Sequence, residues 1–399
     1  VVVIDRFLAE QRFPDGSALG QRAIFMGNDN AVMHNAGTVS GNVGAYLLGQ
    51  ATSVVNTGTI SSFASTLVGT SMYAVRTLAF SSDESDQINT IENHGTLASN
   101  FLAIDADDNP LELEVPSFAR MTTHVVNTGD IIGDIKLGGF DDELRNSGYI
   151  NGDIYMGDDD DLYLGQDGRM ESNAKIYLGS GEDRMDGGDG RERVYDGSGD
   201  DEVSLGGGND YVRVGGGGDN YDGGAGKDYI SYYDSSSGIR IDLRDNEISR
   251  SWGSNDTIKD FESASGSKTG DDRMLGSDTA NTFKSYGGND KLYGRGGNDK
   301  LYGGDGADYF DGGAGADLLY GGDGDDVFHF DHGEGKDVIK DFENNVDVIE
   351  LDNFGLTKVQ AFALATDSGG NVIFDFGDDD ILIVENASIA QLQNDLNIV

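Results

Sequence analysis

The sequence predicts an all-β fold: a right-handed parallel β-helix that runs into parallel β-roll blocks and ends in a small cap of one β-hairpin and short helices. Nine-residue Gly/Asp units recur in two blocks, an Asn-x-Gly motif recurs upstream, and apolar residues alternate near the end of the 399-residue chain. The first two patterns have periods at which a unit buries its core only by stacking on the next. The expected domains are a β-helix at 1–177, a roll block at 178–231, a connecting β element at 232–284, a second roll block at 285–341 and a cap at 342–399.

The nine-residue units that begin at Ser285 keep three columns in register. They read SYGGNDKLY, GRGGNDKLY, GGDGADYFD, GGAGADLLY and GGDGDDVFH. Each unit predicts a turn of about six residues and a strand of about three, whose middle side chain points inward. Two units make one coil, so alternate Asp residues are expected on the same edge. The three columns are Asp290, Asp299, Asp308, Asp317 and Asp326, then Leu292, Leu301, Phe310, Leu319 and Phe328, and finally Gly288, Gly297, Gly306, Gly315 and Gly324.

An earlier block, Leu178 to Ser231, repeats in the same frame. Its units read LGSGEDRMD, GGDGRERVY, DGSGDDEVS, LGGGNDYVR, VGGGGDNYD and GGAGKDYIS. Glu192 is the one departure from Asp, and its side chain is longer and lies between the non-glycine residues Arg191 and Arg193, so a metal site at this unit is an open question. The acidic column is Asp183, Glu192, Asp201, Asp210, Asp219 and Asp228.

The charge of the chain calls for a bound cation. It has 72 acidic and 27 basic residues, a net charge of -45. Carboxylates stacked at the strand spacing of about 4.8 Å repel one another strongly without counter-charge. Calcium takes six to eight oxygens from carboxylates and carbonyls, and we expect roughly three or four ions per block. The predicted ligands are Asp183, Asp201, Asp210, Asp219, Asp228, Asp290, Asp299, Asp308, Asp317, Asp326 and Asp337, with Asn209, Asn289, Asn298, Gly288, Gly297, Gly306, Gly315 and Gly324.

These eleven units resemble the RTX (repeats-in-toxin, haemolysin-type) calcium-binding family, whose consensus is GGxGxDxUx. A disordered Gly/Asp linker would not keep the apolar column in register. The ending of the chain also resembles the C-terminal region of RTX proteins that use type I secretion. The resemblance implies export to the exterior or cell surface of a Gram-negative bacterium. Scarce cytosolic Ca²⁺ would leave the repeats unfolded for transport, and abundant external Ca²⁺ would fold them.

An Asn-x-Gly motif marks the rungs of the N-terminal half. It reads NAGTVSG, NTGTISS, NHGTLAS, NTGDIIG and NSGYING, at spacings of 21, 37, 34 and 19 residues. A rung of about twenty residues, sometimes enlarged by a loop, fits a right-handed parallel β-helix. We expect each Asn at a left-handed bend and hydrogen-bonded to the Asn of the next rung, with the Gly relaxing a second bend. A β-sandwich with NxG hairpins is the alternative. The motifs begin at Asn35, Asn56, Asn93, Asn127 and Asn146.

Two segments link the β-helix to the roll. LGGFDDELR (137–145) and MGDDDDLYL (156–164) are degenerate nine-residue turns interleaved with NSGYING. We therefore expect helix and roll to merge into one stack, with Asp142 and Asp161 as the first calcium ligands. Further along, the connecting element contains three more acids that we expect to be solvated turn residues: Asp256, Asp272 and Asp278.

The remaining segments predict a loop and a cap. The segment 101–123 carries two of the three prolines and the acidic run DADDN, so we expect a surface loop inserted in one rung. Near the end, LTKVQAFALA predicts a short helix, and NVIFDFGDDDILIVEN predicts a hairpin that turns at 377–380. SIAQLQNDL predicts a second helix, with Ser388 as N-cap and Gln391 at the capping-box position.

No catalytic motif is recognisable. The sequence has no nucleophile elbow, phosphate loop or HExxH motif, and the nine basic residues of the first 175 form no cluster. His34 and His94 adjoin the Asn motif, where stacking at a bend is the expected role. His329 and His332 follow the last roll strand and are expected at the surface. Whether the chain is an enzyme stays open, with a non-enzyme favoured.

We therefore predict a secreted structural or cell-surface protein that folds on Ca²⁺ and self-associates into a surface layer, matrix or filament. Cell-surface or extracellular polysaccharide is a further expected partner. A polysaccharide lyase or epimerase on the β-helix and a carbohydrate-binding adhesin are the alternatives. The acidic balance argues against nucleic acid, no apolar run is long enough to insert in a membrane, and the absence of Cys excludes disulfides.

Overall fold

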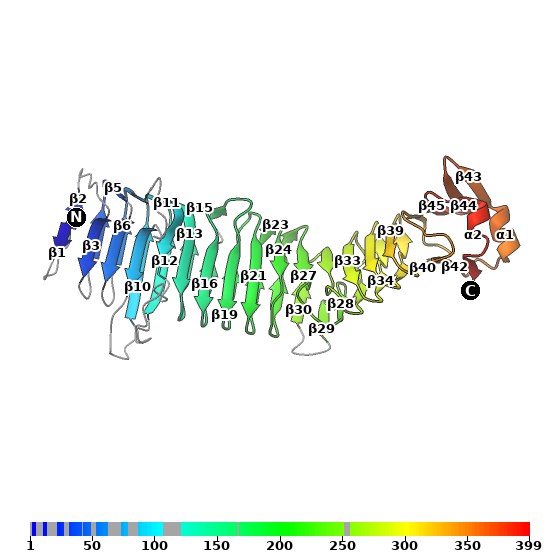
Figure 1. Ribbon diagram of the computed structural model, residues 1–399, viewed down its shortest axis with the longest axis horizontal. Coiled ribbons are helices and arrows are strands. Elements are labelled where there is room, and N and C mark those ends of the chain that lie inside the picture. The colour runs from blue at the N-terminus through cyan, green and yellow to red at the C-terminus, as the bar shows by residue number, and fades with distance from the viewer. Residues whose placement is uncertain are drawn as a thin grey trace. The chain divides into compact units, whose positions relative to one another are not determined.

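A computed structural model describes residues 2–4, 11–13, 22–27, 32–41, 43–48, 53–62, 73–78, 87–106, 121–165, 167–250 and 256–399. The chain forms two compact units, unit 1 (Val1–Val212) and unit 2 (Arg213–Val399). Parallel strands dominate both, and the antiparallel pairs lie in unit 2 (Figure 1). The all-β parallel architecture predicted from the sequence is therefore confirmed. Most of the predicted inserted loop, 107–120, lies outside the described residues.

Unit 1 consists of two parallel sheets whose strands alternate along the chain. The first sheet contains β1 (Val2–Ile4), β3 (Arg22–Gly27), β5 (Thr38–Gly41), β6 (Val43–Leu48), β8 (Thr59–Ser62), β9 (Tyr73–Leu78), β11 (Thr96–Asp105), β13 (Asp130–Gly138), β15 (Tyr149–Asn151), β16 (Ile154–Asp158), β18 (Arg169–Met170), β19 (Ile176–Ser180) and β21 (Arg193–Ser198). The second contains β2 (Gln11–Phe13), β4 (Val32–Asn35), β7 (Ser53–Asn56), β10 (Gln87–Asn93), β12 (Met121–Asn127), β14 (Glu143–Asn146), β17 (Leu162–Leu164), β20 (Arg184–Asp186) and β22 (Glu202–Ser204). Two short strands follow, β23 (Gly207–Gly208) and β24 (Tyr211–Arg213).

A ladder of buried asparagines runs through the second sheet. The motif Asn residues are paired in register from β4 to β14, and all of these pairings are parallel. Asn35 Nδ2 donates to Asn56 Oδ1 at 2.8 Å, and Asn127 Nδ2 donates to Asn146 Oδ1 at 2.8 Å. Equivalent bonds join Asn93 to its neighbours in the ladder. The predicted ladder is confirmed, and the β-sandwich alternative is wrong.

The bends that follow these asparagines differ from expectation. None of the five motif Asn residues, nor the Gly two places after each, has a positive φ, so the predicted left-handed bends are wrong. Glycine is needed for a different reason. A Cβ on Gly58 would overlap the carbonyl oxygen of Gly37 in the preceding rung, and a Cβ on Gly95 would overlap that of Gly58. The motif therefore selects Gly for close stacking of backbones.

Unit 2 also consists of strands in two sheets, most of them paired in parallel. The first sheet contains β27 (Tyr229–Ser231), β31 (Ser263–Ser265), β33 (Thr282–Gly287), β36 (Lys300–Asp305), β39 (Leu318–Asp323), β41 (Lys336–Ile339), β43 (Ala365–Ser368), β44 (Asn371–Gly377) and β45 (Asp380–Val384). The second contains β25 (Asn220–Asp222), β28 (Ile239–Asp242), β29 (Glu247–Arg250), β30 (Asp256–Lys259), β32 (Arg273–Leu275), β34 (Lys291–Tyr293), β37 (Tyr309–Asp311), β40 (Val327–Asp331), β42 (Val348–Asp352) and β46 (Leu396–Ile398). The short strands are β26 (Ala225–Gly226), β35 (Gly296–Gly297) and β38 (Ala314–Gly315), and the helices are α1 (Lys358–Ala363) and α2 (Ile389–Leu392).

The apolar column of the nine-residue units forms the core of the roll. Leu292, Phe310 and Phe328 are paired in register on β34, β37 and β40, and each is almost wholly buried. On the opposite sheet, Leu301 pairs with Leu319. The two sheets therefore share one narrow core, to which each nine-residue repeat contributes a single large side chain.

The connecting element interrupts the parallel order with an antiparallel excursion. β28 pairs antiparallel with β29, which pairs antiparallel with β30. Around this excursion the coil continues, because β25 pairs parallel with β30 and β28 pairs parallel with β32.

The C-terminal cap has the predicted elements. Thr357 caps α1, β44 and β45 form the hairpin, and Ser388 caps α2 with Gln391 in the capping box. β45 and β46 add parallel to β41 and β42, so the cap covers the last strand of each sheet. Among the described residues, no helix has the length and apolar character needed to span a membrane.

Candidate metal centre

The column acids of the second block form two stacks, one on each edge of the roll. Asp290 N donates to Asp308 Oδ1 at 2.8 Å, and Asp308 N donates to Asp326 Oδ1 at 2.9 Å. On the other edge, Asp299 N donates to Asp317 Oδ1 at 2.7 Å, and Asp317 N donates to an oxygen of Asp337. The period of nine residues therefore places alternate acids on the same edge, as predicted. One carboxylate oxygen of each acid accepts the backbone N–H of the preceding coil.

The second oxygen of Asp299, Asp308, Asp317 and Asp326 lies buried over a glycine. A Cβ on Gly303 would overlap Asp308 Oδ2, and a Cβ on Gly321 would overlap Asp326 Oδ2. Within the described residues these oxygens have no hydrogen-bond partner. A buried unpaired oxygen is costly unless a proton or a cation meets it. The acids that share this state are Asp161, Asp183, Asp290, Asp299, Asp308, Asp317, Asp326 and Asp337.

Burial also changes the acidity of these groups. It raises the pKa of Asp299, Asp308 and Asp326 from 3.8 to about 7. A carboxyl group in this position therefore holds a proton near neutral pH unless a cation supplies the counter-charge. Hard anionic oxygens beside turn glycines are the donor set that Ca²⁺ prefers, so these residues fit a calcium ion.

The same stack begins upstream, within the β-helix of unit 1. Asp142 N donates to Asp161 Oδ1 at 2.7 Å, and Asp161 N donates to Asp183 Oδ1 at 2.8 Å. Asp183 N in turn donates to Asp201 Oδ1. The column thus joins residues of the Asn-x-Gly region to residues of the first roll block, and the predicted merging of helix and roll is confirmed.

The unusual Glu192 also lies in a column. Its side chain is buried, and its backbone N–H donates to Asp210 Oδ1 at 2.8 Å. Burial, followed by the nearby charge of Asp210, raises the pKa of the Glu192 carboxyl. The longer side chain therefore keeps its place in the stack, although its role toward a metal stays a prediction.

Two acids of the connecting element are not the solvated turn residues that we expected. Asp256 and Asp272 are each only 2% exposed, because the excursion returns them to the column positions. Asp256 Oδ2 accepts from the Tyr232 hydroxyl at 2.7 Å, and Asp272 Oδ2 accepts from Ser267 N at 2.8 Å. Hydrogen bonds therefore satisfy these oxygens within the protein. Asp278 is exposed, as expected.

A buried ion pair was missed by sequence reasoning. Arg295 Nη1 donates to Asp242 Oδ1 at 2.6 Å, and Nη2 donates to Asp242 Oδ2 at 3.0 Å. The Asp242 side chain is wholly buried, so a guanidinium supplies its counter-charge. Arg295 stands where Gly313 stands in the next coil, and both have positive φ. This departure from the repeat was the available signal, but the partner lies 53 residues away.

The predicted Asn and Gly ligands lie around the turns. Asn289 and Asn298 are exposed, and their side-chain oxygens accept N–H groups of Ala307 and Ala316 at 2.9 and 3.0 Å. Asn209 is also exposed. The structure therefore places these Asn side chains at the solvent side of the turns, and a metal role for them stays a prediction. Of the predicted Gly column, four members have positive φ: Gly288, Gly297, Gly306 and Gly324.

Comparison with protein families addresses the same residues. Segments 175–191, 186–221, 195–230, 268–301 and 302–339 match the family model of the RTX calcium-binding nonapeptide repeat. These segments are RTX calcium-binding repeats. RTX repeats bind Ca²⁺ in general, and RTX proteins are typically exported by type I secretion. The RTX match includes all of the predicted Asp ligands except Asp142 and Asp161, which continue the column upstream.

Among solved structures, this RTX-repeat chain is similar to the extracellular lipase LipA from Serratia marcescens. The similarity has 16% sequence identity and a TM-score of 0.27, and it covers 60% of this chain and 45% of the lipase chain. The matched part thus spans less than half of the lipase, and no activity is inferred from it. No curated protein matches the chain.

Proposed function

We propose that this protein is a secreted structural or cell-surface protein that folds on binding Ca²⁺ and assembles through Ca²⁺ into a surface layer, matrix or filament. The observation that carries the proposal is the row of buried carboxylate oxygens that lie over glycines without a hydrogen-bond partner. A fold with such rows is stabilised by any cation that binds the folded state only. Calcium therefore acts as part of the scaffold.

The charge of the chain supports a switch between two states. At a net charge of -45, the metal-free chain repels itself, and its many glycines favour the unfolded state further. Where Ca²⁺ is scarce the repeats stay unfolded, and where it is abundant they fold by mass action. This behaviour suits a protein that is threaded through an exporter before it folds.

The first experiment tests folding. Circular dichroism of the full chain is recorded in Ca²⁺, in EGTA, and in EGTA with excess Mg²⁺. We expect a strong β signal in Ca²⁺ alone, because Mg²⁺ is smaller, requires octahedral geometry and gives up water reluctantly. An equal β signal in EGTA would rule out Ca²⁺-driven folding.

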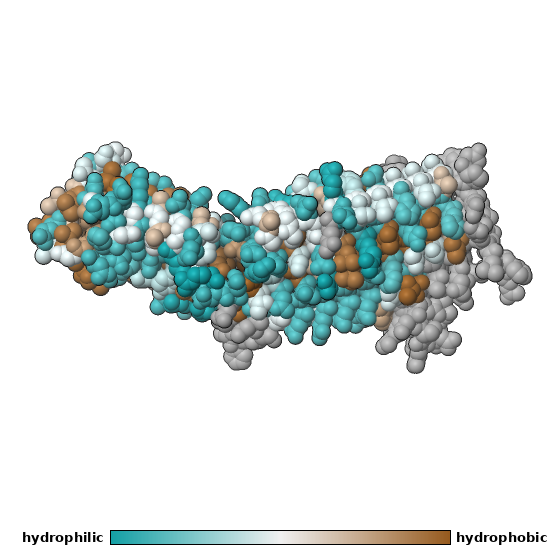
Figure 2. All heavy atoms as spheres, turned by 180° about the vertical axis from the view of Figure 1, so that it is seen from behind, coloured by the Kyte–Doolittle hydropathy of each residue, from teal (hydrophilic) through white to brown (hydrophobic). Residues whose placement is uncertain are grey.

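The acidic surface of the protein supports assembly through Ca²⁺. Hydrophilic residues cover much of the face drawn in Figure 2, and exposed turn acids such as Asp160 and Glu182 stack along unit 1. Carboxylates on two molecules can share one Ca²⁺, so contacts between copies are expected to need the ion. Light scattering and negative-stain electron microscopy at rising Ca²⁺ test this. Monomers at every Ca²⁺ concentration that folds the chain would contradict assembly without contradicting folding.

A polysaccharide-active function is the second candidate, and one pocket favours it. Tyr149, Arg169 and Glu171 line an open pocket of unit 1, where the Tyr149 hydroxyl donates to Glu171 Oε2 at 2.7 Å. That hydrogen bond raises the pKa of Tyr149, which keeps the hydroxyl protonated. Incubation with uronic-acid polymers, followed by absorbance of unsaturated products, distinguishes the candidates. Turnover by the wild type that Glu171→Gln abolishes would favour the enzyme.

A further inference from the structure

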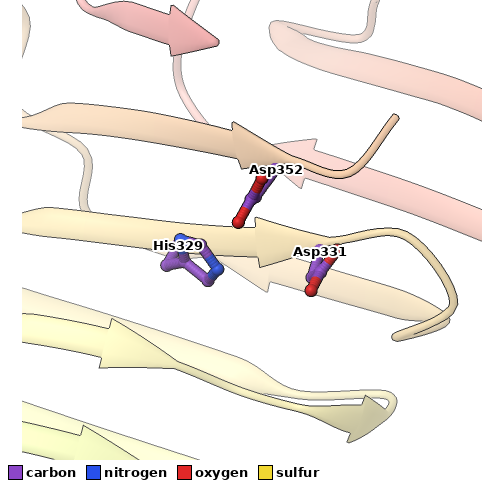
Figure 3. A group of neighbouring side chains, drawn as sticks. All are labelled: His329, Asp331 and Asp352. Carbon is purple, nitrogen blue, oxygen red and sulfur yellow. The ribbon is translucent and has the colours of Figure 1, made fainter. Parts of the chain in front are cut away.

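Three side chains with metal-binding groups meet where the roll joins the cap. His329 and Asp331 lie two residues apart on β40, on the same face of the strand. Asp331 is paired in register with Asp352 of β42. Ligand atoms of all three lie within 4.8 Å of one another, and Figure 3 shows Asp352 reaching across toward the strand that carries the other two. The parallel register thus brings together an imidazole and two carboxylates.

Both carboxylates accept hydrogen bonds from Asn353, and Asp331 Oδ1 also accepts from His332 N at 2.6 Å. Asn353 Nδ2 donates to Asp331 Oδ2 at 3.0 Å, and Asn353 N donates to Asp352 Oδ1 at 2.7 Å. Like charges directly opposite each other on paired strands are destabilising. The hydrogen bonds from Asn353 fix the positions of both carboxylates in spite of that repulsion. Such hydrogen bonds are typical of the residues around metal ligands.

The histidine supplies an independent observation. Although His329 was expected at the surface, its side chain is only 15% exposed. Its Nδ1 atom is buried and has no hydrogen-bond partner within the described residues, and Glu350 Oε2 lies 4.0 Å from it. A buried imidazole normally fixes its tautomer through a hydrogen bond on one nitrogen. This ring therefore has a nitrogen available as a ligand.

We propose that His329, Asp331 and Asp352 bind one divalent transition-metal ion, with Zn²⁺ as the probe. An imidazole with two carboxylates suits Zn²⁺ and similar ions, whereas the all-oxygen columns of the repeats suit Ca²⁺. The site joins β40, which lies within the RTX repeats, to β42, the strand on which β46 of the cap is paired. It is therefore a second kind of metal site, which fastens the end of the roll, and it does not depend on assembly.

The test uses the full chain with Ca²⁺ in large excess, so that the calcium columns are saturated and the repeats are folded. Isothermal titration with Zn²⁺ measures affinity and stoichiometry, and Co²⁺ serves as a coloured substitute whose visible absorption reports nitrogen and oxygen ligands. We expect one strong site in the wild type. His329→Ala and Asp352→Asn are each expected to weaken Zn²⁺ binding by at least about tenfold, and Asn353→Ala by about tenfold through lost orientation.

His332→Ala is the matched control. His332 is a neighbouring histidine whose side chain is 55% exposed and lies outside the cluster, so its variant should bind Zn²⁺ and Co²⁺ as the wild type does. Circular dichroism in Ca²⁺ confirms that each variant is folded. The proposal is overturned if the folded wild type binds no Zn²⁺ in excess Ca²⁺, or if His329→Ala retains the wild-type affinity and Co²⁺ spectrum. The wild-type titration decides the matter even if a variant does not fold.

Discussion

At the scale of single residues, the two oxygens of a column carboxylate have different surroundings. One oxygen accepts a backbone N–H from the preceding coil, as Asp308 Oδ1 does from Asp290 N. In Asp299, Asp308, Asp317 and Asp326 the other oxygen lies where a Cβ atom would stand if the residue five places earlier were not glycine. Geometry therefore makes each Asp both a structural acceptor and a candidate metal ligand, and the two roles are separable by mutation.

Asp308→Asn keeps the accepting oxygen and removes the charge. We expect the variant to need more Ca²⁺ for folding and to lose about 1.5 to 3 kcal/mol from the Ca²⁺-bound free energy of unfolding, the range for a hydrogen bond to a charged group. Calcium titrations followed by circular dichroism give the folding midpoint. Asp278→Asn is the control, since Asp278 is exposed, and it should leave the midpoint unchanged.

Gly303→Ala tests the space itself. Its Cβ would overlap Asp308 Oδ2, so we expect weaker Ca²⁺-dependent folding and a lower thermal midpoint in Ca²⁺. Gly216→Ala is the matched control, because nothing lies within 4 Å of a Cβ built there. Equal melting curves for the two variants would show that the glycine space is not needed.

The raised pKa values of the column acids predict the pH dependence of the metal-free protein. For Asp299, Asp308 and Asp326 the pKa rises from 3.8 to about 7 on folding. Protonation therefore favours the folded state: the contribution is complete below pH 3.8 and is lost as the pH rises through about 7. In EGTA we expect more β structure at pH 5 than at pH 8. Thermal melts in EGTA across this range test it, and a midpoint that rises with pH would contradict it.

At the scale of elements, the early rungs of unit 1 and the later coils of the chain have different polar ladders. The rungs β4, β7, β10, β12 and β14 are joined by asparagine amides, which donate and accept at once and carry no charge. Later coils use carboxylates, which accept but do not donate, and Asp299, Asp308, Asp317 and Asp326 each have an oxygen without a hydrogen-bond partner among the described residues. From Asn35 to Asn127 each amide donates to the next amide in the ladder, whereas we expect a metal ion to complete the carboxylate ladder.

Asn93→Ala interrupts the amide ladder in its middle. It removes the acceptor for Asn56 Nδ2 and the donor to Asn127 Oδ1, so we expect a loss of about 1 to 3 kcal/mol in the free energy of unfolding of unit 1. Ca²⁺ affinity should not change. Denaturant melts in Ca²⁺ measure the loss, and His94→Ala, at a neighbouring exposed side chain, is the control. A Ca²⁺ midpoint that shifts with Asn93→Ala would show that the ladders are coupled.

At the scale of the whole molecule, the two kinds of ladder predict uneven stability. Removal of Ca²⁺ should unfold the coils that depend on carboxylates and spare the amide-linked rungs. Hydrogen–deuterium exchange in EGTA should therefore show fast exchange in β34, β37 and β40, and slower exchange in β7, β10 and β12. Uniform exchange along the chain would mean that both ladders unfold as one cooperative unit.

Much of the fold and part of the candidate site could be predicted because, in a repeat protein, residues one coil apart in the sequence lie beside each other in the structure. The nine-residue period placed Leu292 under Phe310 and Asp290 beside Asp308, and the recurrence of Asn predicted the amide ladder. The left-handed bends were predicted wrongly. Gly occurs both where φ is positive and where two backbones stack closely, and the spacing of the motif does not distinguish these cases.

The sequence by itself therefore determined the parallel stacking, the core column and the acids that stack beside it, since a strict period leaves one way to bury an apolar side chain in every nine-residue repeat. Only the tertiary structure decided what happens where the period fails. The excursion between β28 and β30 returns Asp256 and Asp272 to buried positions, Arg295 finds Asp242 across 53 residues, and Asp352 meets His329 through strand register. Contacts of this kind depend on the lengths of irregular connections, which no repeat encodes.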